Sequence, residues 1–398
     1  MNETPVVRLL EGKRTREEYE DFRRTLQSTG RKALEDFLLS NIRGQNGEGR
    51  KGVGARRYAD GSVFEGELMG EIREGKGVLT LAPGEVYFGE FRNNRPEGKG
   101  SQIFPGGERY EGMFLGGKRN GLGRYVYLSG DFYEGEWKDG LRHGSGKMYY
   151  FGTDELYVGQ WANGVREGRG SFKFSFGDQY DGIWKNDMRE GMGTLTYANG
   201  DVFEGAWHLG VAEGNGTMLY SDGDRYEGMW SEGRKNGMGV MRYSNEGTYQ
   251  GQFKNDQRSG IGKFTYDTKD IYNGQWRENE RHGRGVYRYA NGDVYDGDWR
   301  SDVYNGTGEL YSKDAGKYNG EWLNGEMQGE GIMEYPNGDI YQGKWQKGMR
   351  HGAGHYLFST GQSFTGFWVN DVIEGNGVLR EGNQTMEVAF QNGRFVPL

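Results

Sequence analysis

An aromatic residue followed two positions later by glycine recurs along most of this 398-residue chain. The triplet begins at Phe64, Tyr87, Tyr110, Tyr133, Tyr157, Tyr180, Phe203, Tyr226, Tyr249, Tyr272, Tyr295, Tyr318, Tyr341 and Phe364. Every step is 23 residues except one of 24, and a Gly-x-Gly triplet running from Gly52 to Gly375 keeps the same steps. Such a period is typical of repeat proteins, in which each unit packs only against its neighbours.

The spacing inside each unit is that of a β-strand. In the segment YEGEW, Tyr133, Gly135 and Trp137 alternate with glutamates, so the rings and the glycine share one face. All ten tryptophans, from Trp137 to Trp368, follow the first aromatic residue of a unit by four positions. The second half of a unit, such as GMGTLTY at 191–197, alternates in the same way. Each unit is therefore predicted to be a two-stranded hairpin.

Turn signals separate these strands. The Asp-Gly pair at 139–140 and the Asn-Gly pair at 199–200 are of the type that closes tight hairpins. The extra residue of the 24-residue step falls within 151–155, where a turn absorbs it without reversing the faces of later strands. Glycine costs backbone entropy in a strand, but a ring from the neighbouring strand can lie across it and recover contact area. We therefore expect the glycines to be seats for aromatic rings.

Together these patterns predict an all-β fold: an elongated single-layer antiparallel β-meander solenoid of about 15 two-stranded repeats. The array covers residues 46–395, with a degenerate terminal cap from about residue 378, where Met386 and Phe390 replace the aromatic residues. About 30 strands spaced ~4.8 Å apart would extend to ~140 Å. The expected shape is a rod.

Residues 1–45 are predicted to be a short helical leader. Thr15 and Glu18 form a possible capping box and Gly44 a stop signal. The apolar residues at helical spacing are Tyr19, Phe22, Leu26, Leu34, Phe37 and Leu38. This apolar face has three possible uses: covering an exposed sheet edge at the first hairpins, docking on a partner protein, or lying on an anionic membrane.

Composition limits the class of protein. The chain has 14% aromatic residues and 74 glycines, but no cysteine, so disulfides and cysteine-ligated metal sites are impossible. It contains no apolar run long enough to span a bilayer and no signal peptide, which indicates a soluble intracellular protein of the cytoplasm. Residues 58–398 carry a net charge of -12 and residues 1–57 carry +4. The bulk of the chain therefore lacks the basic stripe that nucleic acids require.

The string YEGEWKDGLRHGSG at 133–146 resembles the MORN repeat (membrane occupation and recognition nexus), and the resemblance covers roughly residues 50–395. It implies a twisted single-layer antiparallel sheet that can hold a partner's helix in its trough and can dimerise through its C-terminal repeats. It also implies a place in cilia, flagella, the cortical cytoskeleton or membrane junctions. The histidine of this string is present only at His143, His282 and His351, so no role is assigned to it.

No signature of catalysis is present. The sequence lacks a GxxxxGK[ST] loop, an HExxH motif and a GxSxG elbow, and its Gly-x-Gly triplets lack the strand-to-helix setting of a dinucleotide site. His143 and His282 are six repeats apart and His282 and His351 are three repeats apart, which is too far for them to share a metal ion. We therefore predict no enzyme, no catalytic residues, no cofactor and no metal site.

Three surfaces are candidates for recognition. The first is a trough lined by a row of indoles. These rings could serve only to cover glycines, but a single-layer sheet has no second layer to bury them, so part of the row is expected to meet solvent or a partner. Its residues are Trp137, Trp161, Trp184, Trp207 and Trp230. The second is a stripe in which Met113, Ile183, Ala206 and Met229 replace the glutamate of other repeats. The third, for self-association, lies within 341–390 and centres on Phe364, Phe367 and Trp368.

The leading functional hypothesis is a non-catalytic structural scaffold, a rigid rod that binds and positions partner proteins in a cytoskeletal assembly. By resemblance, the foremost location is the axoneme of a cilium or flagellum. A phosphoinositide-binding adaptor between membrane and cytoskeleton is the alternative, which the acidic charge of residues 58–398 opposes. A regulatory module of an enzyme is the third possibility, since MORN arrays also precede catalytic domains.

Overall fold

The computed structural model describes residues 52–82 and 84–397. These residues form thirty-one β-strands and no helix, which confirms the predicted all-β antiparallel meander. The predicted leader and all its apolar docking residues lie outside the described residues. The chain divides into two compact units, here called the N-terminal unit, which ends at Ser175, and the C-terminal unit, which begins at Phe176. Each is described by itself.

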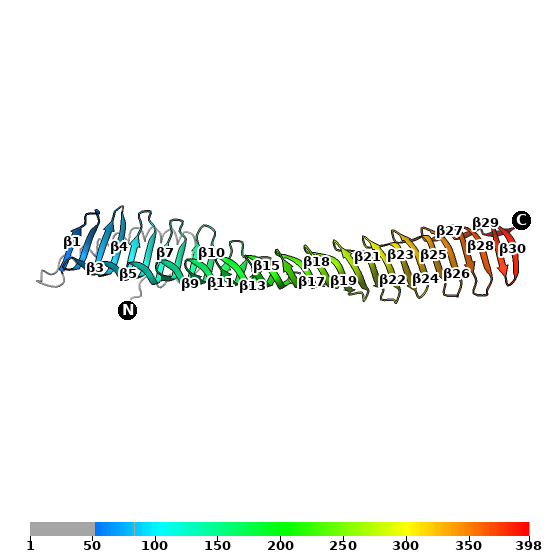
Figure 1. The fold of residues 1–398 in the computed structure, drawn as a ribbon, viewed down its shortest axis with the longest axis horizontal. Coiled ribbons are helices and arrows are strands. Elements are labelled where there is room, and N and C mark those ends of the chain that lie inside the picture. Colours follow the sequence, from blue (N-terminus) through cyan, green and yellow to red (C-terminus); the bar gives the residue numbers. More distant parts are fainter. Residues whose placement is uncertain (1–51, 83, 398) are drawn as a thin grey trace. The chain divides into compact units, whose positions relative to one another are not determined.

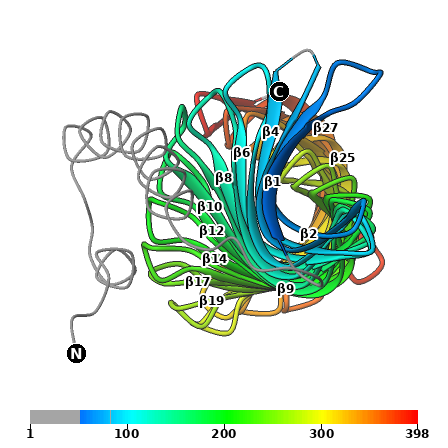
Figure 2. The ribbon, with the colours of Figure 1, turned by 90° about the vertical axis from the view of Figure 1, so that its left-hand side faces the viewer.

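The N-terminal unit is a meander in which each strand pairs antiparallel with the next (Figure 1). Its strands are β1 (Gly52–Arg57), β2 (Val63–Met69), β3 (Ile72–Leu81), β4 (Glu85–Arg92), β5 (Arg95–Ile103), β6 (Arg109–Leu115), β7 (Lys118–Val126), β8 (Phe132–Lys138), β9 (Leu141–Tyr150), β10 (Glu155–Ala162) and β11 (Val165–Lys173). Seen end on, its strands fan round an arc from β4 through β6 and β8 to β10 (Figure 2), which is the twist expected of paired strands.

The C-terminal unit continues the same plan of consecutive antiparallel pairs. Its first ten strands are β12 (Gln179–Lys185), β13 (Met188–Thr196), β14 (Val202–His208), β15 (Val211–Leu219), β16 (Arg225–Ser231), β17 (Arg234–Tyr243), β18 (Gly247–Lys254), β19 (Gln257–Tyr266), β20 (Ile271–Arg277) and β21 (Glu280–Arg288). The remainder are β22 (Val294–Arg300), β23 (Val303–Ser312), β24 (Gly316–Leu323), β25 (Glu326–Glu334), β26 (Ile340–Gln346), β27 (Met349–Leu357), β28 (Ser363–Val369), β29 (Val372–Glu381), β30 (Gln384–Gln391) and β31 (Arg394–Val396).

The register within a hairpin is set by its glycines. In the β8–β9 hairpin Gly135 lies opposite Gly146, and the register then shifts so that Glu136 faces His143. Gly144 sits at this shift with φ +57, a conformation that favours glycine. A Cβ there would also overlap the carboxylate of Glu136. The first glycine of the Gly-x-Gly triplet is therefore required by the bulge, while the second belongs to the facing glycine pair.

Two kinds of turn join the strands. Most short turns have both central residues at positive φ, as at Asn93 (47°) and Asn94 (69°), which is the type I′ geometry that matches strand twist. In the turn between β2 and β3 only Gly70 has positive φ. The longer turns are bonded to one another, because Asp270 Oδ1 accepts the amide of Ala290 in the next hairpin at 2.8 Å. The extra residue of the 24-residue step lies in the turn between β9 and β10, as predicted.

The glycine pairs are covered by aromatic rings, as predicted. Tyr133 is fully buried, and a Cβ on Gly146 of the neighbouring strand would overlap its ring. One detail differs from the prediction, because the same ring also lies over Gly135 of its own strand. At the end of the array, Phe390 lies opposite Gly375, the place that a tryptophan takes in other hairpins. This pairing confirms that Phe390 replaces the aromatic residue there.

Candidate functional site

The aromatic face of each unit is a ladder of rings. Trp137 packs edge-to-face against Tyr133 of its own strand, with ring centres 5.2 Å apart, and against Tyr110 of the preceding hairpin at the same separation. Trp276 repeats this arrangement between Tyr272 and Tyr249. Edge-to-face pairs at such distances are favourable beyond their buried area. An indole placed in this way joins two successive hairpins of the same unit.

Hydrogen bonds hold both kinds of ring in place. The Trp137 Nε1–H donates to the carbonyl oxygen of Gly123 at 3.1 Å, and the Tyr133 hydroxyl donates to the carbonyl oxygen of Glu136 at 2.9 Å. Burial raises the pKa of the equivalent Tyr180 and Tyr341 to about 12. These phenols consequently stay protonated and keep donating to the backbone at the bulge.

Arginines complete this face, and the sequence analysis did not identify them. The guanidinium carbon of Arg119 lies 4.5 Å from the ring centre of Trp137 in the next hairpin, and its Nη2 donates to the carbonyl oxygen of Gly140 at 3.0 Å. The available signal was an arginine nine positions after the first aromatic residue. It occurs at Arg73, Arg119, Arg142, Arg166, Arg189, Arg258, Arg281 and Arg350. Cation–π stacking thus adds a third link between hairpins.

This packing corrects one expectation. The indoles of the predicted trough lie on a common face within each unit, but only 3–6% of each is exposed; they are Trp137, Trp161, Trp184, Trp207 and Trp230. The expectation that part of the row meets solvent was wrong, because the tyrosines and arginines of adjacent hairpins cover it without a second layer. These tryptophans belong to the core. Partner binding through them stays a prediction.

The opposite face, here called the open face, carries a groove whose floor is the facing glycine pairs. In the N-terminal unit a hollow of about 900 Å³ runs over Gly112, Gly123, Gly135, Gly146 and Gly159. Side chains that precede and follow these glycines in the strands form its two rims. The C-terminal unit has hollows at the same place in the repeat, one of about 820 Å³ and one of about 480 Å³.

In many repeats the side chain at one rim position accepts a backbone hydrogen bond within its own hairpin. The carboxylate of Glu136 accepts the amide of Ser145 at 2.9 Å, and Asp298 accepts that of Thr307 at 2.9 Å. Both amides lie at the register shift of their hairpin. The stripe predicted from the sequence occupies this rim position. Met113, Ile183 and Ala206 are half-buried there, whereas Met229 is exposed.

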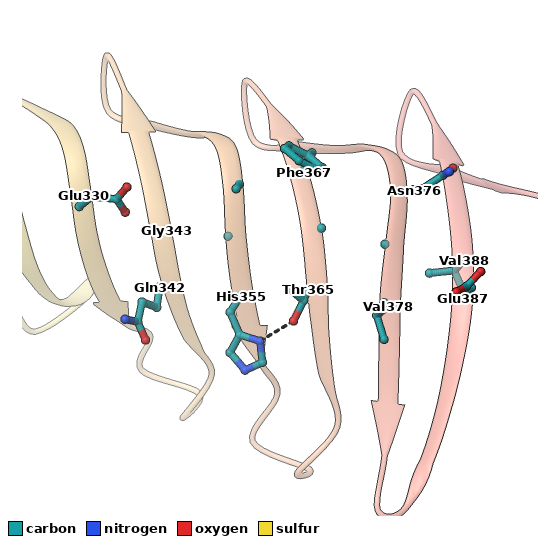
Figure 3. Close-up of a pocket in the computed structure, with 14 residues that line it drawn as sticks. Glu330, Gln342, Gly343, His355, Thr365, Phe367, Asn376, Val378, Glu387 and Val388 are labelled. Atoms are coloured by element: carbon teal, nitrogen blue, oxygen red, sulfur yellow. Dashed lines mark hydrogen bonds between the residues drawn. The ribbon is translucent and has the colours of Figure 1, made fainter.

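The three residues predicted for self-association differ in solvent exposure. Phe364 and Trp368 are 3% and 1% exposed and belong to the core, while Phe367 is 56% exposed. Figure 3 shows Phe367 on the open face near the groove, together with His355, whose Nδ1 lies 2.8 Å from Thr365 Oγ1. Of the three residues, only Phe367 has an exposed side chain.

The histidines and carboxylates do not converge. His143, His282 and His351 lie on β9, β21 and β27, each in a different hairpin. Within residues 52–82 and 84–397 no three His, Cys, Asp or Glu side chains are grouped as metal ligands. In that part of the chain no helix is long and apolar enough to cross a membrane. What the described geometry offers is a repeated groove with variable rims.

The fold and groove define the class as a β-hairpin repeat protein. The family model for the MORN repeat matches fourteen consecutive segments, which are 64–86, 87–109, 110–132, 133–152, 157–179, 180–202, 203–225, 226–248, 249–271, 272–294, 295–316, 318–340, 341–363 and 364–384. The chain belongs to the MORN-repeat family, whose members are generally non-enzymatic repeat scaffolds.

No curated protein matches the chain. Among solved structures it is similar to the TCP domain of Drosophila melanogaster SAS-4 in complex with a proline-rich motif of Ana2, with 16% identity and a TM-score of 0.26 over 44% of this chain and 86% of that one. It is also similar to the TCP10 domain of Danio rerio CPAP, with 11% identity and a TM-score of 0.17 over 61% of this chain and 91% of that one.

Proposed function

We propose that this protein is a non-catalytic scaffold that binds partner proteins along its open-face groove and positions them in a cytoskeletal assembly. The observation that carries the proposal is the difference between the two faces of the sheet. The aromatic face is filled by its own tyrosines, tryptophans and arginines. The open face repeats a hollow over glycine pairs in both units.

The rims of this groove vary from repeat to repeat, which suits recognition. The rim position that holds Glu136 in one hairpin holds Ile183, Gln275 or Phe367 in others. A groove with a constant floor and variable walls can take different partners at different hairpins. Regularly repeated hairpins would set those partners at multiples of about 10 Å, the width of two strands.

The family resemblance supports the axoneme of a cilium or flagellum as the foremost location of this scaffold. MORN-repeat proteins occur in cilia, flagella and the cortical cytoskeleton, where stable protein arrays need fixed spacing. The C-terminal hairpins at 341–390 are proposed as a homodimer contact, supported by the exposed Phe367.

The test is fractionation of ciliated cells that express the tagged full chain. If the proposal is correct, the protein stays with the detergent-insoluble cytoskeletal or axonemal fraction, and a defined set of proteins copurifies with it after mild extraction. Recovery of the chain alone, with no stoichiometric partner, would overturn the scaffold.

The alternative is a phosphoinositide-binding adaptor between membrane and cytoskeleton. Its discriminating measurement is flotation of the full chain with phosphatidylinositol bisphosphate vesicles at physiological salt. We expect no flotation, because residues 58–398 carry a net charge of -12, which repels anionic headgroups. Salt-resistant flotation would replace the cytoskeletal proposal with the membrane one.

A further inference from the structure

Apolar side chains gather on the open face of the first three hairpins of the C-terminal unit. They occupy the groove rim on five of the six strands from β12 to β17 and form a row, here called the methionine row. Its members are Ile183, Met192, Ala206, Met229 and Met238. Met192 is 61% exposed and Met238 53%, although the aromatic face of the same strands is buried. Methionine is suited to contacts with varied apolar surfaces because its side chain is flexible and polarizable.

The strand register aligns the members of this row across the sheet, and Asn215 of β15 is the polar residue that interrupts it. Met192 lies opposite Ala206 across β13 and β14, and Asn215 lies opposite Met229 across β15 and β16. From Gln275 on β20 onward, the same rim positions hold mainly charged and polar residues. The row is therefore a local feature of these hairpins and not a requirement of the repeat.

The patch extends to the short-turn end of the same hairpins, where Met188, Leu209 and Val211 are exposed. Leu209 has φ +47 at the first position of a type I′ turn. In the other short turns that position holds Asn, Asp, Gly, Glu, Ser or Lys. Leucine is conformationally unfavourable at positive φ, and because its side chain is 59% exposed, little burial offsets this cost. Such an outlier points to a role outside the fold.

The surroundings of this patch are acidic. Residues 176–246 contain 12 Asp and Glu but only 6 Lys and Arg. Two of these six basic side chains lie on the aromatic face and not on the open face. Arg189 lies 4.0 Å from the ring centre of Trp207, and Lys235 lies 5.4 Å from that of Tyr220. Asp181 and Glu204 stand on the opposite rim, beside the methionine row. Glu227, further along that rim, forms ion pairs with Arg225 and Arg242 at 3.4 and 3.5 Å. The surface is thus apolar along the methionine row and negative on the opposite rim at Asp181 and Glu204.

We propose that this patch docks a basic amphipathic helix from a partner protein. The apolar stripe of the helix lies on the methionine row, and its Lys and Arg side chains reach the acidic rim. The hollow of about 480 Å³ between Met192, Glu204 and Glu227 receives one apolar anchor. This inference rests on the proposed scaffold function and assigns a partner class to one part of its groove.

The strand spacing fixes the size of the partner helix. Five steps of ~4.8 Å separate β12 from β17, which gives ~24 Å, and a helix of that length has about 16 residues. Its apolar anchors should recur every three to four residues along one face. An acidic helix or a nucleic acid would meet like charge at the rim, so both are expected to fail.

The test is titration of the full chain with two fluorescent peptides of about 18 residues, one made of Leu and Lys and the other of Leu and Glu in the same amphipathic pattern. The Leu/Lys peptide should bind and the Leu/Glu peptide should not. The triple variant M192Q/M229Q/M238Q should weaken binding about tenfold or more while leaving the charge unchanged. Glutamine is compatible with this rim, because Gln160 and Gln252 occupy it in other hairpins.

The matched control is the triple variant L115Q/L128Q/L323Q, which removes three exposed apolar side chains outside the patch, none of which lines a hollow of the open-face groove. It should leave the affinity for the Leu/Lys peptide within about twofold. Equal loss in both triple variants would show that binding is only non-specific attraction to an acidic protein and would overturn the inference. Absence of Leu/Lys binding to the unmodified chain would overturn it as well.

A second variant separates function from folding. Leu209→Asn places a residue that tolerates positive φ in the turn, so the midpoint of thermal unfolding should rise while the affinity for the Leu/Lys peptide falls. A rise in the unfolding midpoint with unchanged peptide affinity would show that Leu209 does not contribute to the binding patch.

Failure of this inference is distinct from failure of the scaffold. If partners copurify with the M192Q/M229Q/M238Q variant as well as with the unmodified chain, the inference falls and the scaffold stands. If nothing copurifies with the unmodified chain, the scaffold falls too.

Discussion

The tyrosine hydroxyl at the start of each repeat shows how much a single atom does in this protein. In most repeats it donates to the carbonyl oxygen at the register shift, as Tyr272 does to Gln275 at 2.8 Å. Phe64, Phe203 and Phe364 fill the same seat without that bond. The ring is therefore the packing element, and the hydroxyl adds a hydrogen bond to the carbonyl oxygen at the register shift.

We expect Tyr272→Phe to lower the free energy of unfolding by about 1 kcal/mol, the usual cost of one hydrogen bond. Tyr272→Ala should cost about 3–5 kcal/mol, because the glycine pair beneath the ring would lose its cover. Urea unfolding followed by tryptophan fluorescence measures both. Similar losses for the two variants would mean that the hydroxyl, and not the ring, seats the hairpin.

The same seat explains the glycines. A Cβ on Gly274 would overlap the Cα of Gly285 and the ring of Tyr272, so Gly274→Ala is expected to lower the free energy of unfolding by about 1–3 kcal/mol. Gly152 has open space around its Cα, so Gly152→Ala is the matched control and should change stability by less than about 0.5 kcal/mol. Thermal unfolding of both variants checks the pair; equal shifts would contradict this account.

At the scale of the element, the hairpin is the unit of structure and its turns are where length can change. Between the facing glycines Gly146 and Gly159, across the turn from β9 to β10, the chain is one residue longer than between Gly193 and Gly205 in the corresponding connection. Strands cannot absorb such a change, because a shift of one residue moves every later side chain to the other face.

Deletion of Gly152 should therefore give a folded protein with an unfolding midpoint close to that of the parent chain. Deletion of Gln275 within β20 should lower the midpoint strongly, because Trp276 would be turned toward the open face. Circular dichroism during heating measures both midpoints. A cooperative transition at the parental midpoint for the Gln275 deletion would refute the fixed register.

At the scale of the whole molecule, the contacts proposed for assembly lie on the open face and in the C-terminal hairpins at 341–390. Phe367 is the exposed member of the predicted self-association residues, in a hollow with His355, Val378 and Glu387 on its walls. An exposed aromatic ring in such a hollow is a typical anchor for a second protein surface.

If the full chain dimerises through 341–390, Phe367→Glu should shift its sedimentation coefficient toward that of the monomer, because a buried carboxylate is costly at an interface. Leu122→Glu, at an exposed apolar position of the N-terminal unit, is the control and should not change the coefficient. Unchanged sedimentation of the Phe367→Glu variant at concentrations where the parent dimerises would exclude this contact. Small-angle scattering on the same samples tests the predicted length of ~140 Å.

The local part of this structure could be predicted from the sequence. The 23-residue period and the alternation of Tyr133, Gly135 and Trp137 identify the hairpins, their common face and the ring-on-glycine contact. These features depend on spacings within one or two strands, which the sequence carries directly. The turn that holds the extra residue was found for the same reason.

The burial of the tryptophans and the open-face groove were decided only by the tertiary structure. The indoles are covered because the tyrosine and arginine of an adjacent hairpin stack on them, as Tyr110 and Arg119 do on Trp137. The groove arises because the rims of many strands align over facing glycine pairs. Both depend on the placement of successive hairpins against one another, and the pattern within one repeat carries no record of that placement.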